Sequence, residues 1–224
     1  MDVVDPVPSL FSFTIQDKQL CSLMGLSVAN ATITVPGFKP QEGALLITHW
    51  GMSGPAIIKA SAWSARYLHE CGYRSSFDVD WLPGFSHEDV FNRFSEMKNA
   101  GSNQQCQTQS LFSDIPLRLW RYFLTKCDAD GCTWSTLSQK KLRVLVDLLK
   151  KDRYSLTAKG VFKEEFVTSG GVNCDTMSMK TMESKAIPGL FVVGECLNID
   201  GVTGGFNFQN AWSTGYIAGM NVGK

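Results

Sequence analysis

The chain has 224 residues, 44% hydrophobic and 19% charged, which is enough for one or two domains with packed cores. Its formal net charge is +0 and its pI about 6.8, so bulk electrostatics favour neither nucleic acid nor an anionic membrane as partner. No run approaches the roughly 18 apolar residues that span a bilayer, and the acidic N-terminus is unlike a signal peptide. We therefore expect a soluble, intracellular protein in the cytoplasm, with an organelle as the alternative.

The seven cysteines are scattered and form no C-x-x-C pair. Cys127 and Cys132 are the closest two, but the three histidines lie far from them in sequence. We predict free thiols in a reducing compartment and no metal site.

The N-terminal region, residues 8–48, carries strand patterns. Apolar residues alternate over 26–28 and again, in the opposite phase, over 31–35, which predicts a bulge near Ala29. Residues 36–43 are typical of a turn and 44–48 of a strand, so the region predicts a hairpin.

A helix and a strand follow. Ser53 is a plausible helix start because Pro55 suits the first helical position, and the helix is expected to reach about Glu70. Its predicted inner face consists of Ile57, Ile58, Ser61, Ala65 and Leu68. Alternation over 77–81 predicts a half-buried strand.

Residues 86–152 change character and predict three helices, with loops near 101–105 and 128–131. The predicted apolar positions are Val90, Phe91, Phe94 and Met97; Leu119, Trp120 and Phe123; and Leu142, Leu145, Val146 and Leu149. Four lysines flank the third helix, at 140, 141, 150 and 151, and we interpret them as a solvated face. Strand patterns return from Tyr154 and run through Phe166–Thr168.

The C-terminal stretch predicts a strand, a glycine-rich loop and a helix. Leu190–Val193 is typical of a strand buried on both faces, and a helical pattern starts at Phe208. Trp212 is interpreted as core, and Ala211, Gly215 and Gly219 as a ridge of small residues that permits close packing. Thr203 or Asn207 is expected to cap the helix.

This arrangement suits a phosphorylated, hydroxylated cofactor. The first amides of a helix lack intrahelical partners and attract anions. Glycines 201, 204 and 205 leave the backbone open to a ligand, and the carboxylate of Glu195 suits sugar-type hydroxyls. A plain tight turn is the alternative reading of the glycines.

The residues from Thr181 to Gly215 closely resemble the C-terminal signature of NAD(P)/FAD-dependent, BaiN-like flavoproteins. Further matching blocks are Pro8–Leu10, Thr48–Ile57 and Thr168–Val172, in the family's order. The resemblance implies a mixed α+β fold with a β-barrel-like insert, a nested helical subdomain, and the last strand and helix of a Rossmann-like FAD domain. The implied boundaries are 1–83 with 154–180 for the substrate-side insert, 84–153 for the helical subdomain and 181–224 for the FAD-domain portion.

By the same resemblance, Glu195 would meet the flavin ribityl chain or a phosphate, and Gly204, Gly205, Phe206 and Asn207 would approach the pyrimidine edge of the flavin. Asp200 and Gly201 would shape the loop. Gly170, Gly171 and Val172 would face the flavin or form a β-turn. No catalytic residue is assigned: His49 is a candidate proton donor, with a structural histidine as the preferred interpretation.

The family's N-terminal half carries the glycine fingerprint for the FAD pyrophosphate, and no G-x-G-x-x-G follows a strand in this chain. We therefore expect the C-terminal part of an FAD-dependent oxidoreductase, acting on a small organic substrate with NAD(P)H as electron donor. Its partner would be the N-terminal FAD-domain half. The alternative is a non-catalytic fragment or binding module that has lost autonomous FAD binding. A nucleoside-triphosphate enzyme is disfavoured, because no G-x-x-x-x-G-K-[ST] occurs.

Overall fold

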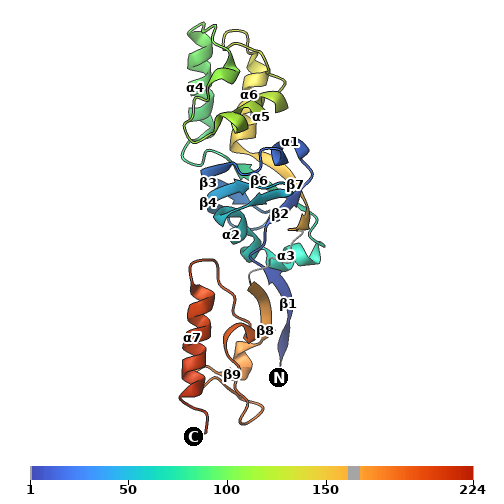
Figure 1. The fold of residues 1–224 in the computed structure, drawn as a ribbon, viewed down its shortest axis with the longest axis vertical. Helices are drawn as coiled ribbons and strands as arrows, with labels where there is room; N and C mark the ends of the chain where they lie inside the picture. The colour runs from blue at the N-terminus through green and yellow to red at the C-terminus, as the bar shows by residue number, and fades with distance from the viewer. Residues whose placement is uncertain (1, 161–166, 224) are drawn as a thin grey trace.

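The computed structural model describes residues 2–160 and 167–223 as an elongated molecule (Figure 1). A helical unit lies at one end, a β-barrel in the middle and a C-terminal unit at the other end. The mixed α+β fold with a barrel and helices, predicted from the sequence, is confirmed. Within the described ranges, no helix combines the length and the apolar composition needed to cross a bilayer.

The barrel closes through antiparallel pairs in the order β2-β5-β4-β3-β6-β7. Its strands are β2 (Phe13–Ile15), β3 (Ser27–Thr34), β4 (Gln41–Ile47), β5 (Gly51–Ser53), β6 (Ser75–Asp80) and β7 (Asp152–Lys159). The predicted hairpin is the β3–β4 pair, and a register shift between Val28 and Ala31 confirms the predicted bulge. The shift allows both Val28 and Ile33 to be buried in one core. A short helix, α1 (Lys18–Cys21), interrupts the region for which the sequence predicts strands.

The helix predicted from Ser53 to Glu70 is two helices, α2 (Pro55–Trp63) and α3 (Ala65–Glu70). They separate at Ser64, whose hydroxyl donates to the carbonyl of Ala60 at 2.6 Å and so competes with the helical ladder. The helix start predicted at Ser53 was wrong. Ser53 is the last residue of β5, where it pairs with Leu46 of β4, and Gly54 occupies the cap position of the helix. The predicted inner face is buried at all five positions.

The helical unit lies between β6 and β7. It consists of α4 (His87–Asn99), the 3₁₀ turn η1 (Cys106–Thr108), α5 (Leu117–Lys126) and α6 (Gln139–Lys150). Its core contains Phe94, Trp120 and Trp134, whose ring centroids lie 5.7 to 6.2 Å apart. The helices therefore surround an aromatic core, as their apolar spacing predicts, and this core is continuous with that of the barrel.

The prediction that Lys150 belongs to a solvated face was wrong. Its side chain is 11% exposed, and its ammonium contacts Asp80 at 2.7 Å and the carbonyls of Leu82, at 2.6 Å, and Phe85. These acceptors lie where β6 leaves the barrel, so Lys150 fastens the end of α6 to the barrel. Lys151 matches the prediction, with 71% of its side chain exposed.

A two-stranded ribbon connects the barrel to the C-terminal unit. It pairs β1 (Val3–Ser9) with β8 (Val167–Val172), while Phe166, predicted as strand, lies outside the described residues. The C-terminal unit continues through η2 (Cys174–Thr176), β9 (Met177–Ser178), β10 (Glu183–Ser184), η3 (Gly194–Cys196) and α7 (Phe206–Gly219). The cluster of Met177, Met182 and Leu197 forms its core.

The buried strand predicted at Leu190–Val193 is wrong. These residues are half-buried, and the described chain gives them one isolated bridge, between Phe191 and Glu183. A strand buried on both faces needs neighbours that supply a ladder on both edges. The segment is therefore extended without belonging to a sheet.

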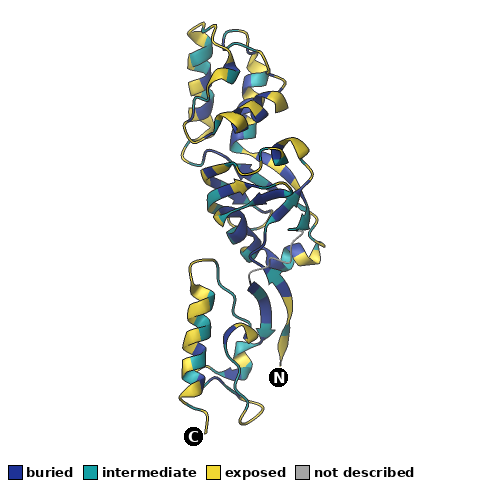
Figure 2. Cartoon of the chain, in the orientation of Figure 1, coloured by how far each residue is buried: buried dark blue, intermediate teal, exposed yellow. Residues whose placement is uncertain are grey.

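Trp212 is also not core, because 68% of it is exposed. The small residues Thr214 and Ala218 face inward, and the hydroxyl of Thr214 accepts the N–H of Gly194 at 2.9 Å. Of the predicted ridge, Ala211 lies against Gly194, whereas Gly215 has open space beside it. Because α7 lies so close to η3, only its small residues fit between the two elements. Its large residues face outward, as the exposed residues of α7 in Figure 2 show.

Candidate functional site

The glycine-rich loop of residues 201–205 is held by one side chain. The amide of Asn207 accepts the N–H of Gly201 at 2.8 Å and donates to the carbonyl of the same residue at 2.9 Å. Asn207 therefore braces the loop and does not cap the helix. Sequence spacing alone does not reveal this pair of hydrogen bonds.

Helix α7 begins two residues earlier than predicted, with Gly205 at its cap position and no side chain bonded there. The expected caps, Thr203 and Asn207, were therefore both wrong. Gly205 has φ +85°, a left-handed conformation that glycine adopts without strain. Among the described residues, no side chain accepts from the first amides of α7, so this end of the helix can receive an acceptor from a ligand.

Beside this loop lies a cavity of about 430 Å³, which we call the loop cavity. Its wall includes Glu195, Val202, Gly204, Gly205, Asn207 and Ala211. The carboxylate of Glu195 is fixed there, because its Oε1 accepts the N–H of Thr168 at 2.6 Å. An uncapped helix start and a carboxylate thus meet at one hollow.

Three other predicted residues line a second cavity, of about 600 Å³, on the barrel side of the loop. They are Asp200, Gly201 and Phe206, and we call this hollow the barrel cavity. Val202 borders both cavities, so the glycine loop separates them. The structure therefore divides the predicted set between two neighbouring hollows.

The remaining predicted residues, Gly170, Gly171 and Val172, line neither cavity and belong to strand β8. The β-turn alternative is wrong, because Gly171 pairs with Val4 and Val172 with Val3 in the ribbon. A Cβ on Gly171 would lie 2.5 Å from the carbonyl oxygen of Cys196. The absence of a side chain there serves the packing of η3 against β8.

Sequence reasoning missed the barrel side of the second cavity, which consists of Phe38, Trp63, Arg66 and Tyr67. Trp63 is the last residue of α2 and is 63% exposed. The sequence carried no clear signal for this side, because α2 is mostly apolar and its tryptophan could equally be core.

The ionisable side chains that line the two cavities are those of Glu195, Arg66, Tyr67 and Asp200, and none of them is assigned as the catalytic acid or base. His49 is exposed in the loop between β4 and β5, and its ring lies edge-on to that of Trp50, with 4.1 Å between the ring centroids. The interpretation of His49 as a structural histidine stays a prediction. Cys106 and Cys127 are buried, and burial raises their thiol pKa values to about 12 and about 11, which keeps them protonated. Across the described ranges, no three His, Cys, Asp or Glu residues gather as a metal site would require.

The barrel with a nested helical unit defines a recognisable class of domain. The family described as "HI0933-like protein barrel and H2TH domain" matches residues 7–167, which include the whole barrel and all its helices. The chain belongs to this HI0933-like family.

The chain is also similar to curated proteins. It is 31% identical over 224 residues to the ribosomal RNA dihydrouridine synthase of Haemophilus influenzae and 28% identical over 225 residues to that of Escherichia coli. Both matches cover 99% of this chain and 53% of the relative. A 3-dehydro-bile acid delta(4,6)-reductase of Clostridium scindens is 29% identical over 204 residues, covering 91% of this chain and 47% of that protein. The chain thus spans about half the length of the curated relatives it matches.

Proposed function

We propose that this chain is the C-terminal, barrel-bearing part of an FAD-dependent oxidoreductase that reduces a carbon–carbon double bond with electrons from NAD(P)H. The observation that carries the proposal is the uncapped start of α7, which opens on the loop cavity beside Glu195. The names of the relatives support an oxidoreductase role.

The relatives' names also suggest a substrate class. Dihydrouridine differs from uridine by two hydrogens across one C=C bond that is conjugated with a carbonyl. The bile acid reductase is named for double bonds in a 3-oxo compound. We propose that the substrate of this chain is a ring with a C=C bond conjugated to a carbonyl group. The expectation that nucleic acid is not a partner stays a prediction.

The residues at the loop cavity fit a flavin nucleotide. Gly204 and Gly205 present backbone without side chains, the first amides of α7 can receive an anionic or carbonyl oxygen, and Glu195 can accept a hydroxyl. Asn207 would keep the loop in place. A bound flavin would supply hydride transfer from NAD(P)H to the double bond, and a proton completes the saturated product.

The test of flavin binding is an absorption spectrum after incubation with FAD and desalting, with Gly205→Ala as the variant. The unchanged chain should retain the visible absorption bands of flavin, at about one FAD per chain. The variant should lose about ten-fold in FAD affinity, because an alanine strained at φ +85° shifts the loop.

Gly25→Ala is the matched control. Gly25 has φ +83° and, like Gly205, offers open space to an added Cβ, with nothing within 4 Å of it, but it lies in the turn before β3. Equal loss of FAD from both variants, or a colourless unchanged chain both alone and with the N-terminal half described next, would contradict the proposal.

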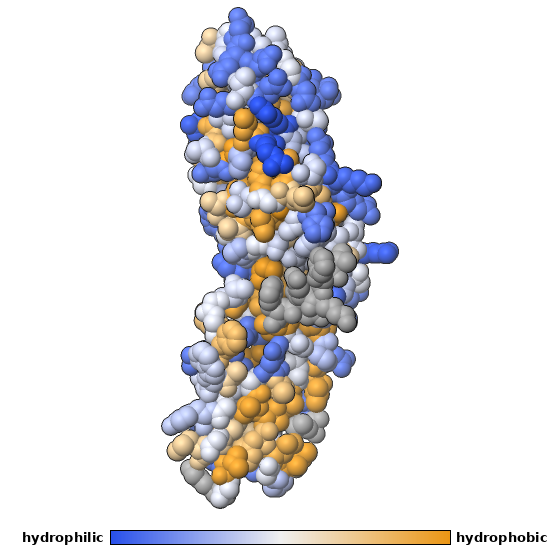
Figure 3. Space-filling model, in the orientation of Figure 1, coloured by the Kyte–Doolittle hydropathy of each residue, from blue (hydrophilic) through white to orange (hydrophobic). Residues whose placement is uncertain are grey.

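We further propose that an N-terminal FAD-domain half covers α7. Phe208, Trp212, Tyr216 and Met220 recur every four residues and are 70%, 68%, 71% and 52% exposed, and we call them the α7 stripe. Figure 3 shows further apolar surface gathered over the C-terminal unit. Single-chain surfaces rarely expose such contiguous apolar patches, and the matched relatives are about twice as long as this chain.

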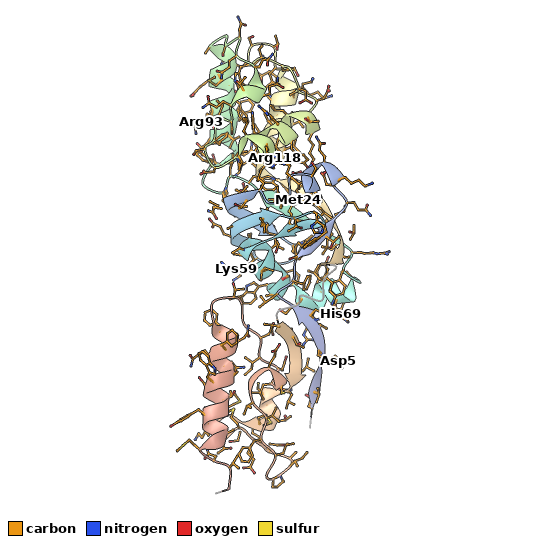
Figure 4. All side chains as sticks on the ribbon, viewed as in Figure 1. Asp5, Met24, Lys59, His69, Arg93 and Arg118 are labelled. Carbon is orange, nitrogen blue, oxygen red and sulfur yellow. The ribbon has the colours of Figure 1, made fainter. Side chains whose placement is uncertain are left out.

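This docking is testable with the N-terminal half of a relative as a separate polypeptide. Trp212→Glu should weaken its binding by about 30-fold, as expected for an aromatic anchor of an interface. Met24→Glu, at a residue 60% exposed near the barrel, should bind like the unchanged chain (Figure 4). Self-association of the chain through the stripe, or equal binding by all three proteins, would contradict this partner and favour the binding-module alternative.

A further inference from the structure

The barrel cavity contains binding features that the flavin site does not use. It lies between the helices α2 and α3 of the barrel and the residues 200–206 of the C-terminal unit. Its volume of about 600 Å³ is that of a site for a small molecule. Since Val202 borders both hollows, a ring held here lies next to the loop cavity.

Aromatic side chains line this cavity on both sides. Trp63 of α2 and Phe206 of α7 are 63% and 61% exposed, so each leaves much of its ring uncovered. Phe38 and Tyr67 contribute a tilted pair with centroids 5.5 Å apart. Such surfaces favour a flat, unsaturated ring, which stacks or packs edge-on against them.

Arg66 of α3 adds a hydrogen-bond donor. Its Nη1 donates to the carbonyl of Asp5 at 3.2 Å, and Figure 4 shows Asp5 on strand β1. Its Nη2 is shielded from water and has no hydrogen-bond partner among the described residues. An unsatisfied buried donor destabilises the protein, and the loss is recovered if a small rotation offers it a ligand oxygen.

An acceptor lies across the same hollow. The carboxylate of Asp200 accepts the hydroxyl of Ser9 in a long bond of 3.3 Å and is half-buried. A donor and an acceptor over aromatic walls together match a planar ring that carries a carbonyl oxygen, with or without a neighbouring N–H.

We propose that the barrel cavity binds the reducible ring of the substrate, with Arg66 donating to its conjugated carbonyl oxygen and Trp63 and Phe206 packing on its faces. This assignment rests on the proposed function for its chemistry. It makes Arg66 the residue that orients the double bond toward the loop cavity. Hydrogen bonding to the carbonyl also draws electron density from the double bond and favours hydride addition.

Binding to the whole chain tests the assignment by calorimetry, without cofactor. The probes are uridine 5′-monophosphate and a 3-oxo-4-ene bile acid, which carry the same conjugated carbonyl on different skeletons. The unchanged chain should bind one of them, and Arg66→Met should weaken that binding about ten-fold, as expected for the loss of a charged donor. Which probe binds identifies the skeleton.

Arg118→Met is the control, because Arg118 also donates to a backbone carbonyl, that of Ser22, from a distant exposed position. It should bind like the unchanged chain. Binding unaffected by Arg66→Met, or no binding of either probe, would overturn the assignment. Flavin retention is scored separately, so a chain that keeps FAD yet ignores Arg66→Met fails this inference alone. A chain that binds a probe through Arg66 but keeps no FAD fails the proposed function alone.

Discussion

Replacing Lys126 with methionine is expected to lower the free energy of unfolding by about 3 kcal/mol. The Lys126 ammonium lies 2.6 Å from a carboxylate oxygen of Asp152, whose side chain is 2% exposed. It also lies 4.7 Å from the ring centre of Tyr154. Removing one partner of a buried pair leaves an uncompensated charge, which destabilises proteins by about 3 to 5 kcal/mol. We take the lower end because 29% of the lysine side chain is exposed. Urea unfolding measures the loss.

The loss should depend on pH in a defined direction. Burial raises the pKa of Asp152 above its ordinary 3.8, although Lys126 and Tyr154 counteract this. A raised folded-state pKa means that the folded protein binds the proton more readily, so stability is lost as pH rises from 3.8 through the folded pKa. Without Lys126 that pKa rises further. The variant should therefore differ more from the unchanged protein at about pH 7.5 than at about pH 4.5.

Two further variants make this result specific. Lys140→Met, at an exposed position of α6, should change stability by less than about 0.5 kcal/mol. Asp152→Asn combined with Lys126→Met should recover part of the loss, because no charge is then buried alone. If Lys126→Met lowers the free energy of unfolding no more than Lys140→Met does, or by the same amount at both pH values, the buried Lys126–Asp152 pair is refuted.

Gly171→Ala is expected to lower the free energy of unfolding of the C-terminal unit by about 2 to 6 kcal/mol while leaving the barrel intact. Gly171 has φ +118°, and an added Cβ would lie 2.5 Å from the carbonyl oxygen of Cys196. Backbone strain and overpacking each destabilise by about 1 to 3 kcal/mol. Hydrogen exchange of α7 amides should accelerate, whereas amides of the barrel strands should keep their protection.

Gly189→Ala is the matched control in the same unit. Its φ is +80°, but nothing lies within 4 Å of the added carbon, so backbone strain alone applies, about 1 to 2 kcal/mol. The contact between β8 and η3 is not what stabilises this unit if the α7 amides exchange at the same rate in both variants. The same conclusion follows if the barrel amides of Gly171→Ala lose protection together with those of α7.

The sequence by itself determined the helices and strands in which apolar residues recur with the period of one buried face. Alternation over 77–81 and the phase change near Ala29 correspond to β6 and to the bulge of β3, because a strand exposes its side chains to two faces in turn. The helical spacing of Leu142, Leu145 and Leu149 likewise corresponds to α6, whose buried inner face packs against α4 and α5 and against the barrel strands β6 and β7. Such elements bury their apolar faces against neighbours within the chain.

Only the tertiary structure decided the C-terminal site. The apolar residues of α7 suggested a buried Trp212, but the approach of α7 to Gly194 admits only Thr214 and small neighbours, so the aromatic residues face outward. The hydrogen bonds of Asn207 to the loop, and an Arg66 Nη2 without a partner among residues 2–160 and 167–223, depend on where distant segments meet, and no local period encodes that. The barrel cavity, likewise, exists because residues 38, 62–67 and 200–206 converge in space, although they lie far apart in the chain.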